Sequence, residues 1–248
     1  MSLFKAVYMF HAIGNLDAED SADKHYAFAE DKFFDLLQKI GGTDSILSSC
    51  TANAHKSVCT FDDGHISNYR IAMLMREKNL GYADFFINPS TIGKKFYLSW
   101  DQVREMSAAG MSMQSHSFDH LYLSDLDEKE QRYQLQKSKA TIEDKTGKTV
   151  SIIAPPGGRF NNLTRKIAAE VGYDIFAGSV PGMWNTDSSA FVKRIPVMQH
   201  NSVHKLESCI HKLSLHRSKL QAKYYMTYGV KRVMGNNSYD ALRRYVLG

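Results

Sequence analysis

The stretch SVCTFDDGH, Ser57–His65, joins a short apolar run to two adjacent acids, a glycine and a histidine. Its first five residues are typical of a buried strand, and the polar cluster begins where that strand would end. Asp62 and Asp63 have two interpretations. They are either carboxylates that cap the next helix at a turn, or two groups with separate tasks in a reaction centre. The stretch alone favours the turn, because short motifs often match by chance.

Runs that resemble this strand recur along the chain and alternate with longer, helix-like runs. The strand-like runs are KAVYMFHA (5–12), SVCTF (57–61), ADFFIN (83–88), MSMQS (111–115), SIIAP (151–155), DIFAGS (174–179) and RIPVM (194–198). The helix-like runs cover 29–41, 68–81, 99–110, 124–147 and 161–172, with Ser99 and Ser124 as expected first caps. This alternation predicts an α/β fold with a parallel sheet, either a barrel or a doubly wound sheet.

The chain has 248 residues, of which 43% are hydrophobic and 23% charged, as in ordinary globular proteins. Barrels of this class routinely reach that length as one unit, so we expect a single domain over 1–248. Residues 201–248 read as a helical, basic element on or beside the barrel, with nine Lys/Arg against two acids. A solvated helix face is the simplest interpretation, and peripheral contact with an anionic membrane or a lipid-linked glycan is the second. Nucleic acid is disfavoured, because no RNP-like or zinc-finger pattern is present.

No stretch approaches the roughly 18 apolar residues that a membrane helix needs. Lys5 and His11 interrupt the apolar N-terminus, and no small-residue cleavage site follows, so we expect a first strand rather than a signal peptide. Cys50, Cys59 and Cys209 show no CxxC spacing, which predicts neither a disulfide framework nor a thiolate zinc site. The cytoplasm is therefore the expected location.

Further polar groups follow other predicted strands, and reactive residues of parallel α/β folds lie at the carboxyl ends of strands. His116 and His120 in SHSFDH are four residues apart, a spacing that suits two imidazoles on one metal, although two hydrogen-bonded histidines without an ion also fit. With one carboxylate they would form a three-ligand set with open positions, as catalytic metal sites require. His11 ends the first strand, where a structural role is the plainer interpretation.

The loop APPGGRFNN, 154–162, follows the strand-like run 151–155. It is either an ordinary turn ending in an Asn cap or a wall of the substrate site whose backbone N–H could face an oxyanion. In the second interpretation the expected substrate contacts are Pro156, Gly157, Gly158 and Phe160.

In this order, TFDDGH, HSFDH and APPGGRFN resemble the motifs of the NodB-type polysaccharide deacetylases, carbohydrate esterase family four. The resemblance covers about residues 8–197. It implies a single distorted (β/α) barrel of about seven strands that removes acetyl groups, usually from nitrogen, from an N-acetylated sugar or glycan. It also implies a divalent metal, zinc first, with nickel, cobalt, iron or manganese as alternatives.

The resemblance also assigns roles. Asp62 would be the general base, while Asp63, His116 and His120 would bind the metal. The strand VYMFH resembles the opening strand of the circularly permuted, poly-N-acetylglucosamine deacetylase branch, which makes His11 the general acid.

One departure from the family concerns the arginine that pairs with the base. Ala154 stands at its place, and we expect Arg194, or less favourably Arg159, to supply the cation. The family's tryptophan motif is not recognisable, and Trp184 is too loosely placed to fill it.

Three rival functions stay open at the level of sequence. One is a metal-dependent C–N hydrolase of a small amide. The second is a catalytically silent carbohydrate-binding protein, and the third is a basic adaptor for nucleic acid or membranes. A full set of acids and histidines argues against the silent protein.

Overall fold

A computed structural model of the chain describes residues 4–20, 22–51, 57–187, 190–211 and 213–234. Its strands are β1 (Phe4–Phe10), β2 (Ala12–Ile13), β3 (Ala27–Phe28), β4 (Thr43–Asp44), β5 (Ser57–Phe61), β6 (Asp84–Ile87), β7 (Ser112–Ser115), β8 (Ile152–Ile153), β9 (Ile175–Ala177), β10 (Met183–Asn185), β11 (Phe191–Val192) and β12 (Ile195–Pro196). Its α-helices are α1 (Glu30–Lys39), α2 (Ile46–Thr51), α3 (Ser67–Glu77), α4 (Trp100–Ala108), α5 (Glu128–Thr146), α6 (Asn162–Val171), α7 (Val203–Glu207) and α8 (Leu215–Met234).

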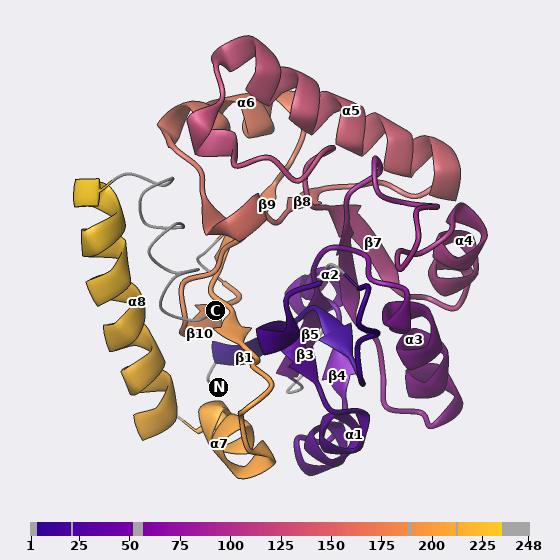
Figure 1. Ribbon diagram of the computed structural model, residues 1–248, viewed down its shortest axis with the longest axis vertical. Coiled ribbons are helices and arrows are strands. Elements are labelled where there is room, and N and C mark those ends of the chain that lie inside the picture. Colours follow the sequence, from indigo (N-terminus) through magenta and orange to yellow (C-terminus); the bar gives the residue numbers. More distant parts are fainter. Residues whose placement is uncertain (1–3, 21, 52–56, 188–189, 212, 235–248) are drawn as a thin grey trace.

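The strands form a nearly closed, barrel-like sheet with helices around it (Figure 1). The parallel path runs β1-β5-β6-β7-β8-β9-β11, and β12, which follows β11 in the chain, pairs in parallel with β1 on its other side. The Val197 amide donates to the carbonyl of Met9, which joins the end of β12 to β1, and the Arg194 amide donates to the carbonyl of Val180 in the segment between β9 and β10. Strand β10 pairs with β1 antiparallel. The predicted (β/α) barrel is confirmed.

Strands β5 and β6 are buried along their whole length and β1 from Lys5 onward, as parallel barrel strands are. Alternate residues point outward to a large layer shared with the helices, which includes Phe10, Phe61 and Phe85. The other set, together with Ile46 at the start of α2, forms a smaller inner core, whose strand-side members are Val7, Val58, Phe86, Ile152, Ala154, Ala177, Trp184 and Val192. The inner set ends at the carboxyl edge in polar side chains, and this edge holds the candidate site.

Helix boundaries follow local signals, with one correction. Ser99 caps α4 in a full capping box with Gln102, as expected, a feature worth about 1 kcal/mol. The prediction that α5 begins at Ser124 is wrong. Ser124 lies in a 3-10 turn (Leu123–Asp125), and Asp127 caps the helix by accepting from the amide of Glu130. Both Ser124 and Asp127 are suitable capping residues by type. Asp127 is the cap because its side chain accepts a hydrogen bond from a free amide of the first helical turn.

The C-terminal segment is helical in two pieces rather than one. Helix α7 and a 3-10 turn (Ser208–Ile210) precede a break, after which α8 begins at Leu215. The buried side chain of Arg217 donates to the carbonyl oxygens of Cys209 (2.6 Å) and His211 (2.8 Å), which ties the start of α8 to that turn. Residues 235–248 of the predicted helical element lie outside the described residues.

Candidate metal and acid–base site

The polar residues singled out in the sequence converge at the carboxyl edge of the barrel. Asp62 and Asp63 follow β5, His116 follows β7, His11 follows β1, and Arg194 directly precedes β12. The amide of Asp62 donates to the carbonyl oxygen of Phe10 (2.9 Å), so the two strand ends that carry Asp62 and His11 are joined directly.

Asp62 points into the barrel and forms a buried, two-pronged ion pair with Arg194. The distances are 2.6 Å from Nη1 to Oδ1 and 2.9 Å from Nη2 to Oδ2. Nε of Arg194 donates to the carbonyl oxygen of Gly178, and the guanidinium also lies over the ring of Phe86. Burial alone would raise the pKa of Asp62, but the charge of Arg194 and nearby imidazoles hold it below its ordinary value. The carboxylate is therefore ionised in spite of its burial.

Asp63 adopts a left-handed backbone conformation (φ 74°) and turns its carboxylate to two histidines. Its Oδ1 lies 3.2 Å from Nε2 of His116 and 3.2 Å from Nε2 of His120. Oδ1 is buried, and neither contact gives it a hydrogen bond. Burial alone would raise the pKa of Asp63, but the imidazoles hold it well below its ordinary value. Side chains that converge in this way without bonding one another suit a cation between them.

The other ring nitrogen of His116 is committed to the backbone. Nδ1 donates to the carbonyl oxygen of Ala154 (2.6 Å), which leaves Nε2 with a lone pair directed at Asp63. Ala154 occupies the place of the family arginine, and the structure uses that position for its carbonyl group rather than for a cation.

The loop after β7 is held by two buried amides. Asn88, at the end of β6, donates to the carbonyl oxygens of His116 and Ser117. Gln134 of α5 accepts from the Ser117 hydroxyl (2.9 Å) and from the amides of Phe118 (3.1 Å) and Asp119 (2.9 Å). These bonds hold both Ser117 (φ 68°) and His120 (φ 60°) in left-handed conformations that cost energy unless the surroundings support them.

His11 lies across the site from the three-residue cluster. Its backbone carbonyl accepts from Asn68 (2.8 Å), and its ring packs against that of Tyr26 with centroids 4.4 Å apart. Burial lowers the pKa of His11, and this effect outweighs the nearby charges of Asp63 and Asp62.

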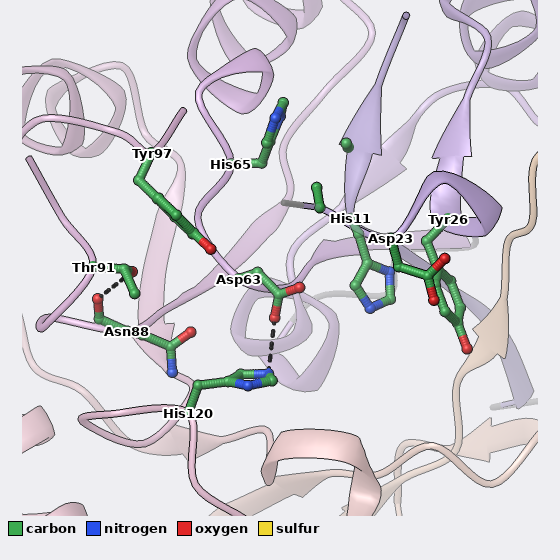
Figure 2. Close-up of a pocket in the computed structure, with 11 residues that line it drawn as sticks. His11, Asp23, Tyr26, Asp63, His65, Asn88, Thr91, Tyr97 and His120 are labelled. Carbon is green, nitrogen blue, oxygen red and sulfur yellow. Dashed lines mark hydrogen bonds and ion pairs between the residues drawn. The ribbon is translucent and has the colours of Figure 1, made fainter. Parts of the chain in front are cut away.

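A cavity of about 310 Å³ opens over these groups. Figure 2 shows Asp63 and His120 facing one another at its centre, His11 and Tyr26 on one side, and Tyr97 on the other. Ala22, Asp23 and Tyr26 reach the cavity from the segment between β2 and β3. A buried contact ties this segment down, because His65 Nε2 lies 2.8 Å from Asp20 Oδ2.

The loop predicted as a substrate wall lies outside the lining of this cavity. Pro156–Gly158 form a 3-10 turn, and Gly157 has a φ of 60°, where a Cβ would also meet the ring of Tyr122 at 2.8 Å. Phe160 packs against Phe176 and Phe191. Arg159, the other expected partner of the base, lies over the ring of Tyr122 instead.

Several cavity residues were missed in the sequence. Asn88 carried a usable signal, since it directly follows a buried strand as Asp62 and His116 do. Tyr26, Asp23 and Tyr97 carried none, because they come from irregular segments whose path is set by long-range contacts. Gln134 was hidden in a polar helical run, where an inward amide looks like a solvated one.

The sequence profile of the polysaccharide deacetylase family matches residues 51–176. Among related sequences, YxkH of Bacillus subtilis, a protein assigned to the polysaccharide deacetylases, is 33% identical over 132 residues, which is 53% of this chain and 47% of that protein. The peptidoglycan-N-acetylglucosamine deacetylase PgdA of Listeria monocytogenes is 26% identical over 197 residues, which is 73% of this chain and 40% of that protein. The chain thus spans less than half the length of these relatives.

Solved structures share the fold. The deacetylase PplD of Streptococcus pyogenes, in complex with acetate, superposes with a TM-score of 0.75 at 24% identity, covering 85% of this chain and all of that one. A polysaccharide deacetylase from Bacillus cereus gives a TM-score of 0.76 at 21% identity, covering 84% of this chain and 69% of that one. With a matching profile over half its length and the same barrel, this chain belongs to the NodB-type polysaccharide deacetylase family.

Proposed function

We propose that this chain is a metal-dependent hydrolase that removes an acetyl group from the nitrogen of an N-acetylated sugar or glycan. The observation that carries the proposal is the division between the two adjacent acids. Asp62 is paired with a buried arginine, whereas Asp63 faces two imidazoles with an oxygen that has no hydrogen bond. Metal-dependent amide hydrolysis uses these two functions, a proton acceptor and a cation site, side by side.

Asp63, His116 and His120 suit a divalent cation such as zinc. Their ligand atoms lie within 4.8 Å of one another, and one oxygen with two nitrogens is a donor set typical of catalytic sites that keep positions open. When bound there, such a cation supplies Lewis acidity, which lowers the pKa of a coordinated water towards about 7 and polarises a carbonyl group.

Asp62 would accept the proton of the attacking water. Its carboxylate is held ionised and oriented by Arg194, so it needs no deprotonation step before it acts. The ion pair has a cost in basicity, since a lowered pKa makes a weaker base. A positioned proton acceptor still contributes about 10²–10⁴-fold to the rate.

His11 would deliver a proton to the departing nitrogen from the opposite side of the cavity. Burial lowers its pKa, so an imidazolium at this place gives up its proton readily. The tilted ring of Tyr26 packs against the imidazole, and the bond from Asn68 to its backbone carbonyl holds the residue in place.

The substrate is best described as an N-acetylated carbohydrate. The Listeria relative is named for its action on peptidoglycan N-acetylglucosamine, and the cavity volume fits a small ring within the usual range for ligand sites. Cys59 and Cys209 are buried free thiols, as expected in a reducing compartment. An enzyme of the cytoplasm, the location that the sequence predicts, does not meet a finished extracellular polysaccharide. Our preferred substrate is therefore a nucleotide- or lipid-linked glycan precursor of surface-polysaccharide assembly.

The test compares Asp62→Asn with Asp63→Ala in the purified protein, by metal analysis and by acetate release from N-acetylated oligosaccharides. We expect Asp62→Asn to keep the metal and lose at least about 10²-fold in turnover. Asp63→Ala should lose both, and chelation of the unaltered protein should abolish release. Equal metal content and equal turnover in the two variants would refute the division of roles. Turnover of small amides without release from oligosaccharides would favour the rival C–N hydrolase.

A second test concerns His11. His11→Ala should leave the metal content unchanged and reduce acetate release by about 10²-fold or more. His204→Ala, an exposed histidine on α7, serves as the matched control and should behave like the unaltered protein. Near-normal turnover in His11→Ala would show that His11 is not the general acid.

A further inference from the structure

Helix α8 presents an apolar stripe to solvent. Leu215 is 82% exposed and Met226 is 73% exposed, and Leu213, just before the helix, is 94% exposed. Leu215, Ala222 and Met226 fall on one face of the helix, because they are seven and four residues apart and these spacings are close to whole turns. Tyr225, on the flank of this stripe, is also more than half exposed. We call this set, with Lys219 and Lys223, the outer face of α8.

The outer face is positively charged. Lys219 and Lys223 are exposed and lie four and eight residues after Leu215, on the flank of the apolar stripe. No acidic residue occurs anywhere between Ser208 and Met234 in the sequence, so neither lysine has a counter-charge on its own helix. Apolar side chains flanked by cations without acids differ from an ordinary solvated face, where both signs alternate.

The inner side of α8 is firmly attached. Arg217 is buried on the carbonyl groups of the preceding turn, and Leu220 packs against the main core. Figure 1 shows α8 as a long, separate helix at the edge of the molecule. The inner side thus attaches α8 to the rest of the molecule and fixes the orientation of the outer face. Within the described residues no other element covers the leucine and methionine side chains of that face.

We propose that the outer face of α8 docks this protein on the surface of an anionic lipid bilayer. A helix that lies in the membrane interface buries aliphatic side chains at the acyl boundary, places aromatic rings at the headgroups and sets lysines against the phosphates. The outer face holds all three kinds of side chain in that arrangement. No helix in the described part of the chain combines the length and hydropathy needed to cross the bilayer, so the contact is peripheral.

A second copy of the chain is a poorer occupant of the same surface. A two-fold contact would bring Lys219 and Lys223 of both copies to one interface without any acid on the helix to offset them. The charge therefore favours a polyanionic surface over self-association. None of the outer-face residues lines the catalytic cavity, so docking is independent of the reaction proposed above.

The test is co-sedimentation of the full chain with vesicles of phosphatidylcholine alone and of an equal mixture of phosphatidylcholine and phosphatidylglycerol. Binding is expected to the mixed vesicles, and at least about tenfold less to the neutral ones. Lys219→Glu/Lys223→Glu should reduce binding to the mixed vesicles by at least about tenfold. Lys129→Glu/Lys137→Glu, the same charge change on the exposed side of α5, should not.

Leu215→Ser/Met226→Ser separates insertion from charge attraction. This variant keeps every charge, and docking predicts a clear loss of vesicle binding, with circular dichroism as the check on folding. The proposal is overturned by absent binding to mixed vesicles, or by binding that the α8 and α5 charge variants reduce equally. It is also overturned by light scattering that shows a dimer broken by Leu215→Ser/Met226→Ser, which would assign the face to a second copy. Vesicle binding needs no catalysis, so failure here and failure of the proposed reaction are distinguishable.

Discussion

Two neighbouring carboxylates, Asp62 and Asp63, reach different surroundings where the backbone leaves the strand. Asp62 continues the strand and points into the barrel at Arg194. Asp63 has a φ of 74°, a conformation that costs free energy for a residue with a side chain, and it faces the two histidines. The strain is retained where it directs a buried oxygen at the proposed cation position.

The Asp62–Arg194 pair supports a prediction for stability. Arg194→Met leaves a buried carboxylate without its cation, and we expect a loss of about 3–5 kcal/mol in the free energy of unfolding. Asp62→Asn/Arg194→Met removes both charges and should recover part of that loss. Urea unfolding of the single and double variants measures the coupling. Strictly additive effects would show that the pair contributes nothing as a unit.

At the level of residues, the sequence predicted which side chains belong to the site better than it predicted the residues that they contact. Polar side chains after apolar runs marked Asp62, Asp63, His116 and His11, since strand ends of a parallel sheet share one edge. Arg194 was expected as the preferred partner of Asp62, with Arg159 as the less favoured alternative. No local pattern chooses between Arg194 and Arg159, because the contact depends on how the last strands return to the first.

At the level of elements, α5 has a function that its polar sequence conceals. Gln134 is fully buried and receives hydrogen bonds from three groups of the loop that carries His116 and His120. It thereby positions the histidines without approaching the proposed cation position. Partners of this kind typically affect metal affinity by about 10–100-fold.

We therefore expect Gln134→Leu to weaken zinc binding by about 10–100-fold while the helix stays folded. The three donors of the loop lose their acceptor, and the left-handed residues in it lose their support. Titration of zinc against a competing chelator measures the change. Gln136→Leu, an exposed glutamine on the same helix, is the control and should leave the affinity unaltered. Equal affinities in both variants would mean that the loop holds its shape unaided.

Elements with strong local signals were predicted closely, and those without them were not. The strand-like run 57–61 coincides with β5, and Ser99 caps α4 as expected. Ser124 failed as a cap because Asp127 offered a better acceptor three residues later. Strand β10 was absent from the prediction, since Met183–Asn185 becomes a strand only by pairing with β1.

At the scale of the whole molecule, one buried acid links stability to pH. Asp84 lies at the start of β6, fully buried, and accepts from the amide of Ile46 (2.7 Å). Burial raises its pKa to about 7. The folded protein thus holds a proton that the unfolded chain loses near pH 4. The stabilisation is fully present below pH 4 and is lost as the pH rises to about 7, at up to about 1.4 kcal/mol per pH unit.

Asp84→Asn should remove this dependence, because the amide stays neutral and its oxygen can still accept from Ile46. Relative to the unaltered protein, the variant should become more stable as the pH rises from 5 to 7 and then show a constant difference. Urea unfolding at several pH values in this window measures the difference. Parallel curves for the two proteins would show that Asp84 is ionised in the fold.

The barrel as a whole was predictable from alternation and motif order, but its closure was not. Strand and helix runs alternate along the chain, which predicts a parallel sheet, and the ordered motifs select the barrel. The closing contacts are the parallel pairing of β12 with β1 and the backbone bond from Val197 to Met9, and such backbone contacts leave no mark in the sequence.

Because the barrel closes with its last strand, we expect the proposed cation site to form before the proposed base receives its arginine. The three proposed cation ligands lie between residues 63 and 120, whereas Arg194 is 132 residues beyond Asp62 along the chain. A nascent or partly folded chain could therefore assemble the ligands while its base still lacks the guanidinium. The proposed turnover would begin only once the final strand has docked. Measured during refolding, acetate release would thus follow completion of the fold, whereas zinc uptake would precede it.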